Sequence, residues 1–308
     1  MAIREITPGL VRELLADQFP EWSALPVKPV AWGGWDNRTM RLGDELLVRL
    51  PSDDCYAPPV QKEQRWLPVL APQLPLAIPT PVARGRPGCG FPLSWSVYRW
   101  LAGEPLTKEN VRDTVSLAVD LGEFLVALRS VDATAAPRPG AENFYRGGDL
   151  ATYDAEARTA IARLGGVTDA KAALDIWEAA LASSWLPAPV WIHGDMAPTN
   201  LLVREGKLSA VIDFGCAAAG DPACDLVIAW TFFSGESRAA FTQAVDLDSD
   251  TWARARGWML WKAAITLADA LNASPLDGDQ AGLRFGWRSS ARIVIDDVLR
   301  EHARHRAG

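Results

Sequence analysis

The chain has 308 residues, of which 49% are hydrophobic and 22% charged, with a formal net charge of -7. This length and composition are typical of a globular protein with a sizeable core. We expect no membrane span, because no run of about 20 apolar residues occurs, and no nucleic-acid partner, which would need clustered Lys and Arg. The start, MAIREITPGL, lacks the basic end and apolar run of a signal peptide, which favours a cytoplasmic protein.

The first hundred residues are predicted to form a small lobe rich in β-strands. A short helix follows Thr7 and Pro8, because threonine caps a helix and proline suits its first turn. Strand-like runs separated by glycine-containing turns come next and predict an antiparallel sheet. These runs cover residues 27–32, 38–42, 46–50 and 91–100.

Between these strands, the segment PPVQKEQRWLPVL places Val60, Glu63 and Leu67 on one face of a predicted helix. A carboxylate in line with apolar side chains needs a partner, because burying it unpaired costs free energy. Pro68 is expected to end or kink this helix.

From about residue 107, apolar residues recur at helical spacing, which predicts a larger and mostly helical second lobe. Two long helical patterns fill its C-terminal third, with Pro275 between them. The turn-rich stretch 135–150 is long enough to be a functional loop, and Arg146 is its candidate contributor.

A polar motif, HGDMAPTN at residues 193–200, follows a predicted buried strand at 190–192 and precedes a hairpin that ends in IDFG. The hairpin brings its own ends together, so Asp195, Asn200 and Asp213 are expected to converge. Two carboxylates and an amide oxygen suit Mg²⁺, which binds one or two protein carboxylates together with substrate phosphates. The spacing H-x-D-x-x-x-x-N followed by D-F-G is the arrangement of kinase catalysis.

The motifs HGDMAPTN, VIDFG and GDPACDL together resemble the signature of the aminoglycoside phosphotransferase family, which has a protein-kinase-like fold. The resemblance covers most of the chain and implies a bilobal α+β fold. The nucleotide-binding lobe would span 1–100 and would consist of a small antiparallel sheet with one helix packed on it. The second, mostly helical lobe would span 101–308 and would contain the catalytic loop, the metal site and the acceptor site. It implies Mg²⁺-dependent transfer of the γ-phosphoryl group of ATP or GTP to a hydroxyl, with Asp195 as the base and Asn200 and Asp213 as metal ligands.

The first lobe supplies candidates for the nucleotide site. Gly33, Gly34 and Asn37 resemble a nucleotide-covering loop, because glycine lets backbone amides approach phosphate; a plain tight turn is the alternative. Arg49 stands where this family's strand normally carries lysine, and it keeps the charge while adding a fork of donors. A pair between Arg49 and Glu63 would account for an acid on an apolar face.

Other residues are assigned by the same resemblance. The segment SVYRWL matches the hinge that meets the nucleobase, which makes Tyr98 and Trp100 nucleotide-binding candidates. His193 is expected to orient the catalytic loop, and Asp221 and Asp225 are expected to brace it. Because Asp221 precedes Pro222 at the start of a predicted helix, it is also a candidate cap. The chain runs from DFG directly into a helical pattern without a long activation segment, which argues against a kinase of peptides.

The expected partners are a nucleoside triphosphate and a hydroxylated small molecule, first an aminoglycoside-like antibiotic. Acids at loops and helix ends would attract such a polyamine, although solvation of helix boundaries also explains them: Asp246, Asp248, Asp250, Asp277 and Asp279. Tryptophans would line an apolar cleft for a macrolide, although at helical spacing they are more often core: Trp230, Trp252, Trp258, Trp261 and Trp287. A macrolide or other metabolite kinase and a non-catalytic nucleotide-binding regulator therefore stay open.

Overall fold

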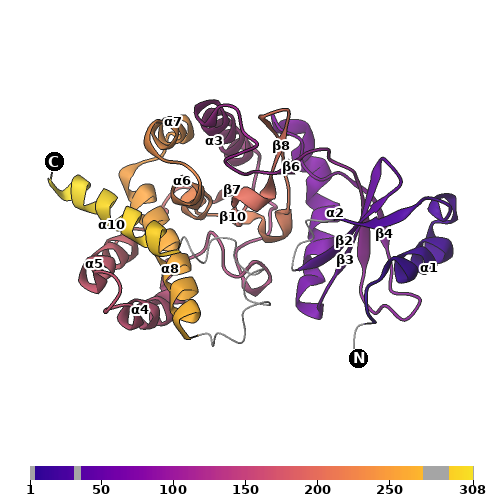
Figure 1. Cartoon of the computed structure of the whole chain (residues 1–308), viewed down its shortest axis with the longest axis horizontal. Coiled ribbons are helices and arrows are strands. Elements are labelled where there is room, and N and C mark those ends of the chain that lie inside the picture. The colour runs from indigo at the N-terminus through magenta and orange to yellow at the C-terminus, as the bar shows by residue number, and fades with distance from the viewer. Residues whose placement is uncertain (1–3, 31–35, 273–290, 308) are drawn as a thin grey trace. The chain divides into compact units, whose positions relative to one another are not determined.

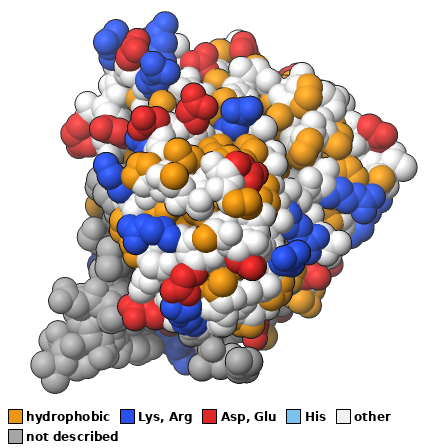
Figure 2. Space-filling model, turned by 90° about the vertical axis from the view of Figure 1, so that its right-hand side faces the viewer, with side chains coloured by type: hydrophobic (Ala, Val, Ile, Leu, Met, Phe, Trp, Pro, Cys, Tyr) orange, Lys and Arg blue, Asp and Glu red, His pale blue; other side chains and the backbone are white. Residues whose placement is uncertain are grey.

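A computed structural model of the chain describes residues 4–30, 36–272 and 291–307. None of the helices formed by these residues is long and apolar enough to cross a membrane. On the face shown in Figure 2, basic and acidic side chains are interspersed.

The chain divides into two compact units. The first combines Met1–Val111 with Thr199–Cys216, and the second combines Arg112–Pro198 with Ala217–Gly308. The first unit therefore takes in a segment that lies far along the sequence. The functional lobes predicted from the sequence, with their boundary at residue 100, stay a prediction.

The first unit contains a five-stranded sheet in the order β1-β2-β3-β5-β4. All its neighbouring strands are antiparallel, which confirms the predicted arrangement. Strand β4 was not predicted, because its sequence PVARG begins with proline and ends with glycine, two residues that are rare inside strands; its edge position tolerates them. The strands are β1 (Val27–Pro29), β2 (Asn37–Leu42), β3 (Leu46–Pro51), β4 (Pro81–Gly85) and β5 (Trp95–Arg99).

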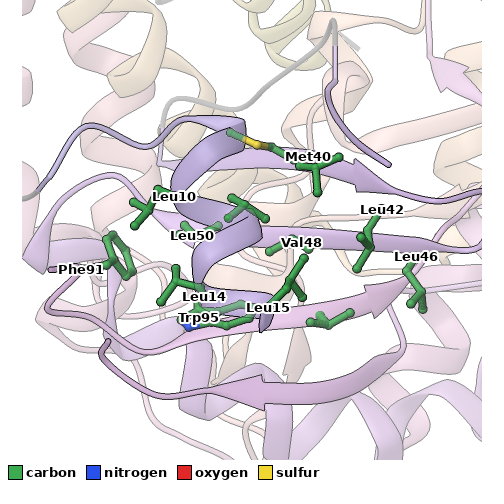
Figure 3. Close-up of a cluster of buried hydrophobic side chains, with 13 residues drawn as sticks. Leu10, Leu14, Leu15, Met40, Leu42, Leu46, Val48, Leu50, Phe91 and Trp95 are labelled. Carbon is green, nitrogen blue, oxygen red and sulfur yellow. The ribbon is translucent and has the colours of Figure 1, made fainter. Parts of the chain in front are cut away.

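Helix α1 (Pro8–Gln18) begins as predicted, because Thr7 Oγ1 accepts a hydrogen bond from Leu10 N at 3.3 Å. Its leucines pack against alternate side chains of β2, β3 and β5 and form one hydrophobic core. Alternate residues of a strand share a face, so this core covers one face of the sheet. Figure 3 labels Leu10, Leu14, Leu15, Met40, Leu42, Leu46, Val48, Leu50, Phe91 and Trp95 of this core.

A second helix, α2 (Pro58–Leu70), lies on the other side of the strands from α1 (Figure 1). Arg49 and Ser96 are opposite each other in register and alternate with the core residues, so they face α2. Gln64 Nε2 on α2 donates to Ser96 Oγ at 3.0 Å. Helix α2 continues past Pro68 to Leu70, so the helix does not end at the proline, although the ring removes the hydrogen bond that an N–H there would donate to the carbonyl one turn earlier.

The predicted hairpin is present, with strands β8 (Leu201–Arg204) and β9 (Lys207–Val211) paired antiparallel. Glu205 and Gly206 have φ values of 54° and 79°, the left-handed conformations that a tight two-residue hairpin turn requires. Strand β6 (Glu104–Pro105) pairs with β8. This pairing ties the hairpin to the first unit.

The second unit is mostly helical, as predicted. Its short strands β7 (Val190–Ile192) and β10 (Ala218–Gly220) pair antiparallel and flank the segment that carries the catalytic motif. The described helices are α3 (Thr114–Ser130), α4 (Asp154–Arg163), α5 (Ala170–Leu181), α6 (Ile228–Thr231), α7 (Gly235–Val245), α8 (Ser249–Asn272) and α10 (Ala291–Ala307).

Candidate active site

The two ends of the β8–β9 hairpin carry Asn200 and Asp213. Ile212 N donates to Asn200 O at 2.8 Å, so the two chain segments lie side by side. Asp213 has a φ of 68°, a left-handed conformation that is uncommon for a residue other than glycine and is frequent at functional sites. The structure therefore places the backbones of two of the predicted metal ligands next to each other, and their role at a metal stays a prediction. Asp195 belongs to the other unit, and its convergence with them stays a prediction.

Arg49 on β3 bridges two carboxylates of the first unit. Its Nη2 lies 2.9 Å from Asp213 Oδ1, and its Nη1 lies 3.4 Å from Glu63 Oε1. The Glu63 side chain is only 4% exposed and also accepts a short hydrogen bond from Tyr98 Oη. The predicted Arg49–Glu63 pair is confirmed, and Arg49 links this pair to Asp213.

The charge states of this cluster follow from its surroundings. Loss of solvent opposes the charge of Arg49, but the carboxylates of Glu63 and Asp213 raise the pKa of Arg49 above its ordinary value. Burial, and then the charge of Glu63, raises the pKa of Tyr98 well above its ordinary value. Arg49 therefore stays cationic, and Tyr98 stays a proton donor to Glu63.

Replacing Arg49 by Met is expected to lower the free energy of unfolding by about 3 kcal/mol, because it leaves the buried Glu63 without a counter-charge. Arg49→Lys should lower the free energy of unfolding by a smaller amount, because lysine keeps the positive charge. Some loss is still expected, because lysine lacks the planar fork that bonds both carboxylates. Urea denaturation measures both. Arg99→Met, at an exposed position on β5, is the control, and equal stability of the Arg49 and Arg99 variants would contradict the account.

The other nucleotide-binding candidates have different surroundings. Tyr98 is 1% exposed, so its side chain belongs to the interior. Trp100 is partly exposed, with the Arg41 guanidinium 4.5 Å from its ring centroid. Asn37 is the first residue of β2. Gly33 and Gly34 lie outside the described residues, so the nucleotide-covering loop and the hinge assignment stay predictions.

Asp195 lies in the segment that follows β7 in the second unit, and Lys262 of α8 donates to its Oδ1 at 3.3 Å. Loss of solvent would raise the pKa of Asp195, but the charges of Lys262 and Arg146 hold it below its ordinary value. The Asp195 side chain is 37% exposed. It is therefore an ionised and partly exposed carboxylate, and its assignment as the general base stays a prediction.

The turn that carries Asp195 is held by hydrogen bonds to a buried carboxylate, that of Asp225. His193 N and Gly194 N donate to the two carboxylate oxygens of Asp225, both at 2.7 Å. Asp195 N donates to His193 Nδ1 at 3.2 Å, and the His193 side chain is fully buried. Burial raises the pKa of Asp225 even though it accepts these hydrogen bonds. His193 and Asp225 therefore both contact the turn directly, and their supporting roles in catalysis stay predictions.

Replacing Asp225 by Asn is expected to lower the free energy of unfolding by about 1–3 kcal/mol. The amide oxygen can accept a hydrogen bond from only one of the two backbone N–H groups, and the amide NH2 would point its own donors at the other. The displaced turn should also slow turnover. Thermal unfolding and kcat measure the two effects. Asp44→Asn, at a fully exposed side chain, should change neither, and an Asp225 variant as stable and active as that control would overturn the bracing role.

Asp221 and Arg254 form the most enclosed ion pair of this region. Asp221 Oδ1 accepts from Ala223 N at 3.1 Å and caps the 3-10 helix Pro222–Val227, as predicted. Arg254 of α8 binds both Asp221 oxygens, with Nε at 2.7 Å and Nη2 at 3.3 Å. The Arg254 and Asp221 side chains are 5% and 9% exposed.

Sequence reasoning missed Arg254 and Lys262. Both interrupt the apolar stretch TWARARGWMLWKAAITLA of a predicted helix. A charge on an apolar helical face predicts a buried partner, which is the signal that identified Glu63. Applied to α8, it would have marked both residues.

The acids expected to attract a polyamine have roles at helix boundaries. Asp248 accepts a backbone hydrogen bond from the first turn of α8 at 2.6 Å. Asp246 ends α7 with a φ of 46°, and Asp250 lies in the first turn of α8. Asp277 and Asp279 lie outside the described residues. The described acids therefore favour the solvation explanation.

Four of the tryptophans considered for an apolar cleft belong to the core of the second unit. Trp230, Trp252, Trp258 and Trp261 are each at most 8% exposed, and Trp287 lies outside the described residues. Trp258 also lines a small hollow beside Asp195. The described tryptophans therefore offer a limited aromatic surface at this hollow and no broad apolar cleft.

Comparison with known sequences gives two matches. A model of the phosphotransferase enzyme family matches residues 27–258. The uncharacterized protein YcbJ of Bacillus subtilis (strain 168) is 25% identical over 181 residues, which cover 56% of this chain and 54% of that protein. The chain thus spans about half the length of this curated relative.

Solved structures show the same fold. The GDP complex of wild-type aminoglycoside 2'-phosphotransferase-IIIa matches with a TM-score of 0.69 and 20% identity, over 96% of this chain and 100% of that chain. The macrolide 2'-phosphotransferase MphH from Brachybacterium faecium matches with a TM-score of 0.58 and 24% identity, over 94% and 97%. The predicted protein-kinase-like fold is confirmed.

Proposed function

Since the chain belongs to the phosphotransferase enzyme family, we propose that it transfers the γ-phosphoryl group of ATP or GTP to a hydroxyl of a small molecule. The observation that supports this proposal most strongly is the cluster of the first unit, in which Arg49 forms ion pairs with both Glu63 and Asp213. Asp213 lies at one end of the β8–β9 hairpin, and Asn200 lies at the other. Phosphoryl transfer needs a fixed cation for the phosphates and oxygen ligands for a metal. This cluster offers both.

Asn200 and Asp213 are the proposed ligands of Mg²⁺. Among the residues that the structure describes, no group of three or more His, Cys, Asp or Glu side chains forms a metal site. A pair made of Asn and Asp is smaller than such a group, and Mg²⁺ completes its shell with water and substrate phosphates. The hard oxygens of this pair fit the ion, which when bound would neutralise phosphate charge.

Asp195 is the proposed general base. Its ionised carboxylate would orient the acceptor hydroxyl and take its proton as the hydroxyl oxygen bonds to phosphorus. The bond between the γ-phosphorus and the nucleoside diphosphate breaks in the same transfer, and the diphosphate leaves. The lowered pKa of Asp195 supports this role, because it keeps the carboxylate ionised at neutral pH.

The acceptor is the finer part of the proposal. An aminoglycoside-like antibiotic is the first candidate by likeness of fold to an enzyme named for aminoglycosides. A macrolide or another small metabolite is the second, and a specific observation favours it: the charges of Lys262 and Arg146 both act on Asp195, and two cations repel a polyamine.

The experiment is a transfer assay with γ-labelled ATP and, separately, GTP. The panel contains kanamycin, erythromycin and hydroxylated metabolites, each with and without Mg²⁺, and a thermal-shift titration reports nucleotide binding. Mg²⁺-dependent label on an acceptor is the expected result. Nucleotide binding without transfer to any acceptor would favour the non-catalytic regulator, and a well-folded protein that binds no Mg²⁺-nucleotide would contradict the kinase proposal altogether.

A further inference from the structure

The hollow beside Asp195 lies entirely within the second unit and carries an excess of positive charge. Its lining includes Arg146, Asp195, Trp258 and Lys262. Asp195 is the single acid among the side chains that line this hollow in the described part of the chain. Lys262 already pairs with it at 3.3 Å. The charge of Arg146 is therefore not balanced within the lining.

The Arg146 guanidinium lies over two aromatic rings. Its Cζ lies 4.8 Å from the Trp261 ring centroid and 5.7 Å from that of Trp258. Trp261 is itself fixed, because its Nε1 donates to Glu156 Oε2 at 2.7 Å and its ring centroid lies 4.0 Å from that of Tyr153, with the two ring planes tilted by 31°. Within the described ranges Arg146 forms no ion pair with a carboxylate. A guanidinium that lies against two rings and pairs with no carboxylate of the described residues is suited to a bidentate oxyanion.

The loop that presents Arg146 is built with backbone strain. Arg146 N donates to Asn143 O at 3.1 Å, and Asn143 Nδ2 returns a bond to Arg146 O at 3.0 Å. Phe144 and Tyr145 have φ values of 53° and 51°, which cost free energy for such bulky residues. A Cβ on Gly147 would lie 2.3 Å from a β7 side chain. Residues with such backbone strain cluster at active sites and ligand-binding loops.

We propose that Arg146 and Lys262 bind an anionic group of the acceptor, a carboxylate or a phosphate, while Asp195 receives its hydroxyl. The acceptor is then a hydroxylated acid rather than a polyamine. This inference rests on the proposed kinase function. A phosphate of the nucleotide is the other source of the same chemistry, so the test separates the two.

The test measures binding by calorimetry without nucleotide, using three probes on one carbon skeleton: gluconate, sorbitol and glucamine, which are anionic, neutral and cationic. Gluconate is expected to bind tightest. Arg146→Gln and Lys262→Gln should each weaken gluconate binding by about tenfold or more, the effect of a lost charged hydrogen bond, and Arg146→Lys should weaken it less. Arg163→Gln, at an exposed position on α4, is the matched control.

A second measurement identifies the source of the anion. The affinity for Mg²⁺ with a non-hydrolysable ATP analogue should stay within about twofold in both Gln variants, well below the tenfold loss of one charged hydrogen bond. A loss of nucleotide affinity without a loss of gluconate affinity would overturn the acceptor assignment. The acceptor assignment would also be overturned if gluconate bound no more tightly than sorbitol and glucamine, or if none of the three probes bound. Failure of the wild-type protein to bind the nucleotide analogue would instead count against the kinase function, since the probe series needs no nucleotide.

Discussion

Replacing Asp195 by Asn is expected to lower kcat by about 10²–10⁴-fold, the usual contribution of a general base. The amide has the shape of the carboxylate but cannot take the proton of the acceptor hydroxyl. Lys262, at 3.3 Å from Asp195 Oδ1, can still donate to the amide oxygen, so the local structure should persist. Steady-state transfer of labelled phosphate, with nucleotide affinity measured separately, tests this.

The matched control is Asp175→Asn, which alters an exposed ion pair between Lys171 and Asp175 on α5. We expect its turnover to equal that of the wild-type protein. An Asp195 variant that kept wild-type turnover on a proven acceptor would remove Asp195 from the mechanism. Loss of nucleotide affinity in that variant would point to a binding role instead.

Replacing Arg254 by Met is expected to lower the free energy of unfolding by about 3–5 kcal/mol, because it leaves the carboxylate of Asp221 buried without its counter-charge. The side chain of Arg254 also donates to Ser183 Oγ at 3.1 Å and to Thr251 Oγ1 at 3.0 Å, and both contacts would be lost. Urea denaturation measures the loss.

An exposed pair gives the comparison for that measurement. Arg292 and Asp296 lie one turn apart on α10, with side chains 53% and 40% exposed. Arg292→Met should cost less than about 1 kcal/mol, because solvent screens such pairs. Similar losses for the Arg254 and Arg292 variants would show that burial of the Asp221–Arg254 pair carries no stability.

Local signals in the sequence were sufficient for much of the fold and site. Thr7 capped its helix as threonine does, and the residues of the β8–β9 turn adopted the left-handed conformations of a hairpin. The Arg49–Glu63 pair followed from one physical argument, that an acid on an apolar helical face needs a partner. Each of these features depends on neighbours in sequence or on a single strong energetic requirement.

Other features depend on contacts that no local pattern specifies. The β4 edge strand forms because β5 offers it a partner, although proline and glycine disfavour strands. Asp213 was predicted as a metal ligand, but its ion pair with Arg49 links residues 164 positions apart. Lys262 reaches Asp195 from a helix far along the chain. Tertiary packing determines such contacts. The sequence therefore indicated which residues carry the charges, but not which residues they would pair with.

The central claim is tested most directly by transfer of labelled γ-phosphate from ATP or GTP to a hydroxylated acceptor, with wild-type and Asp195→Asn proteins side by side, with and without Mg²⁺. The account predicts Mg²⁺-dependent transfer by the wild-type protein, and loss of transfer with retained nucleotide binding in the variant. Transfer at equal rates by both proteins, or transfer that does not depend on Mg²⁺, would contradict it.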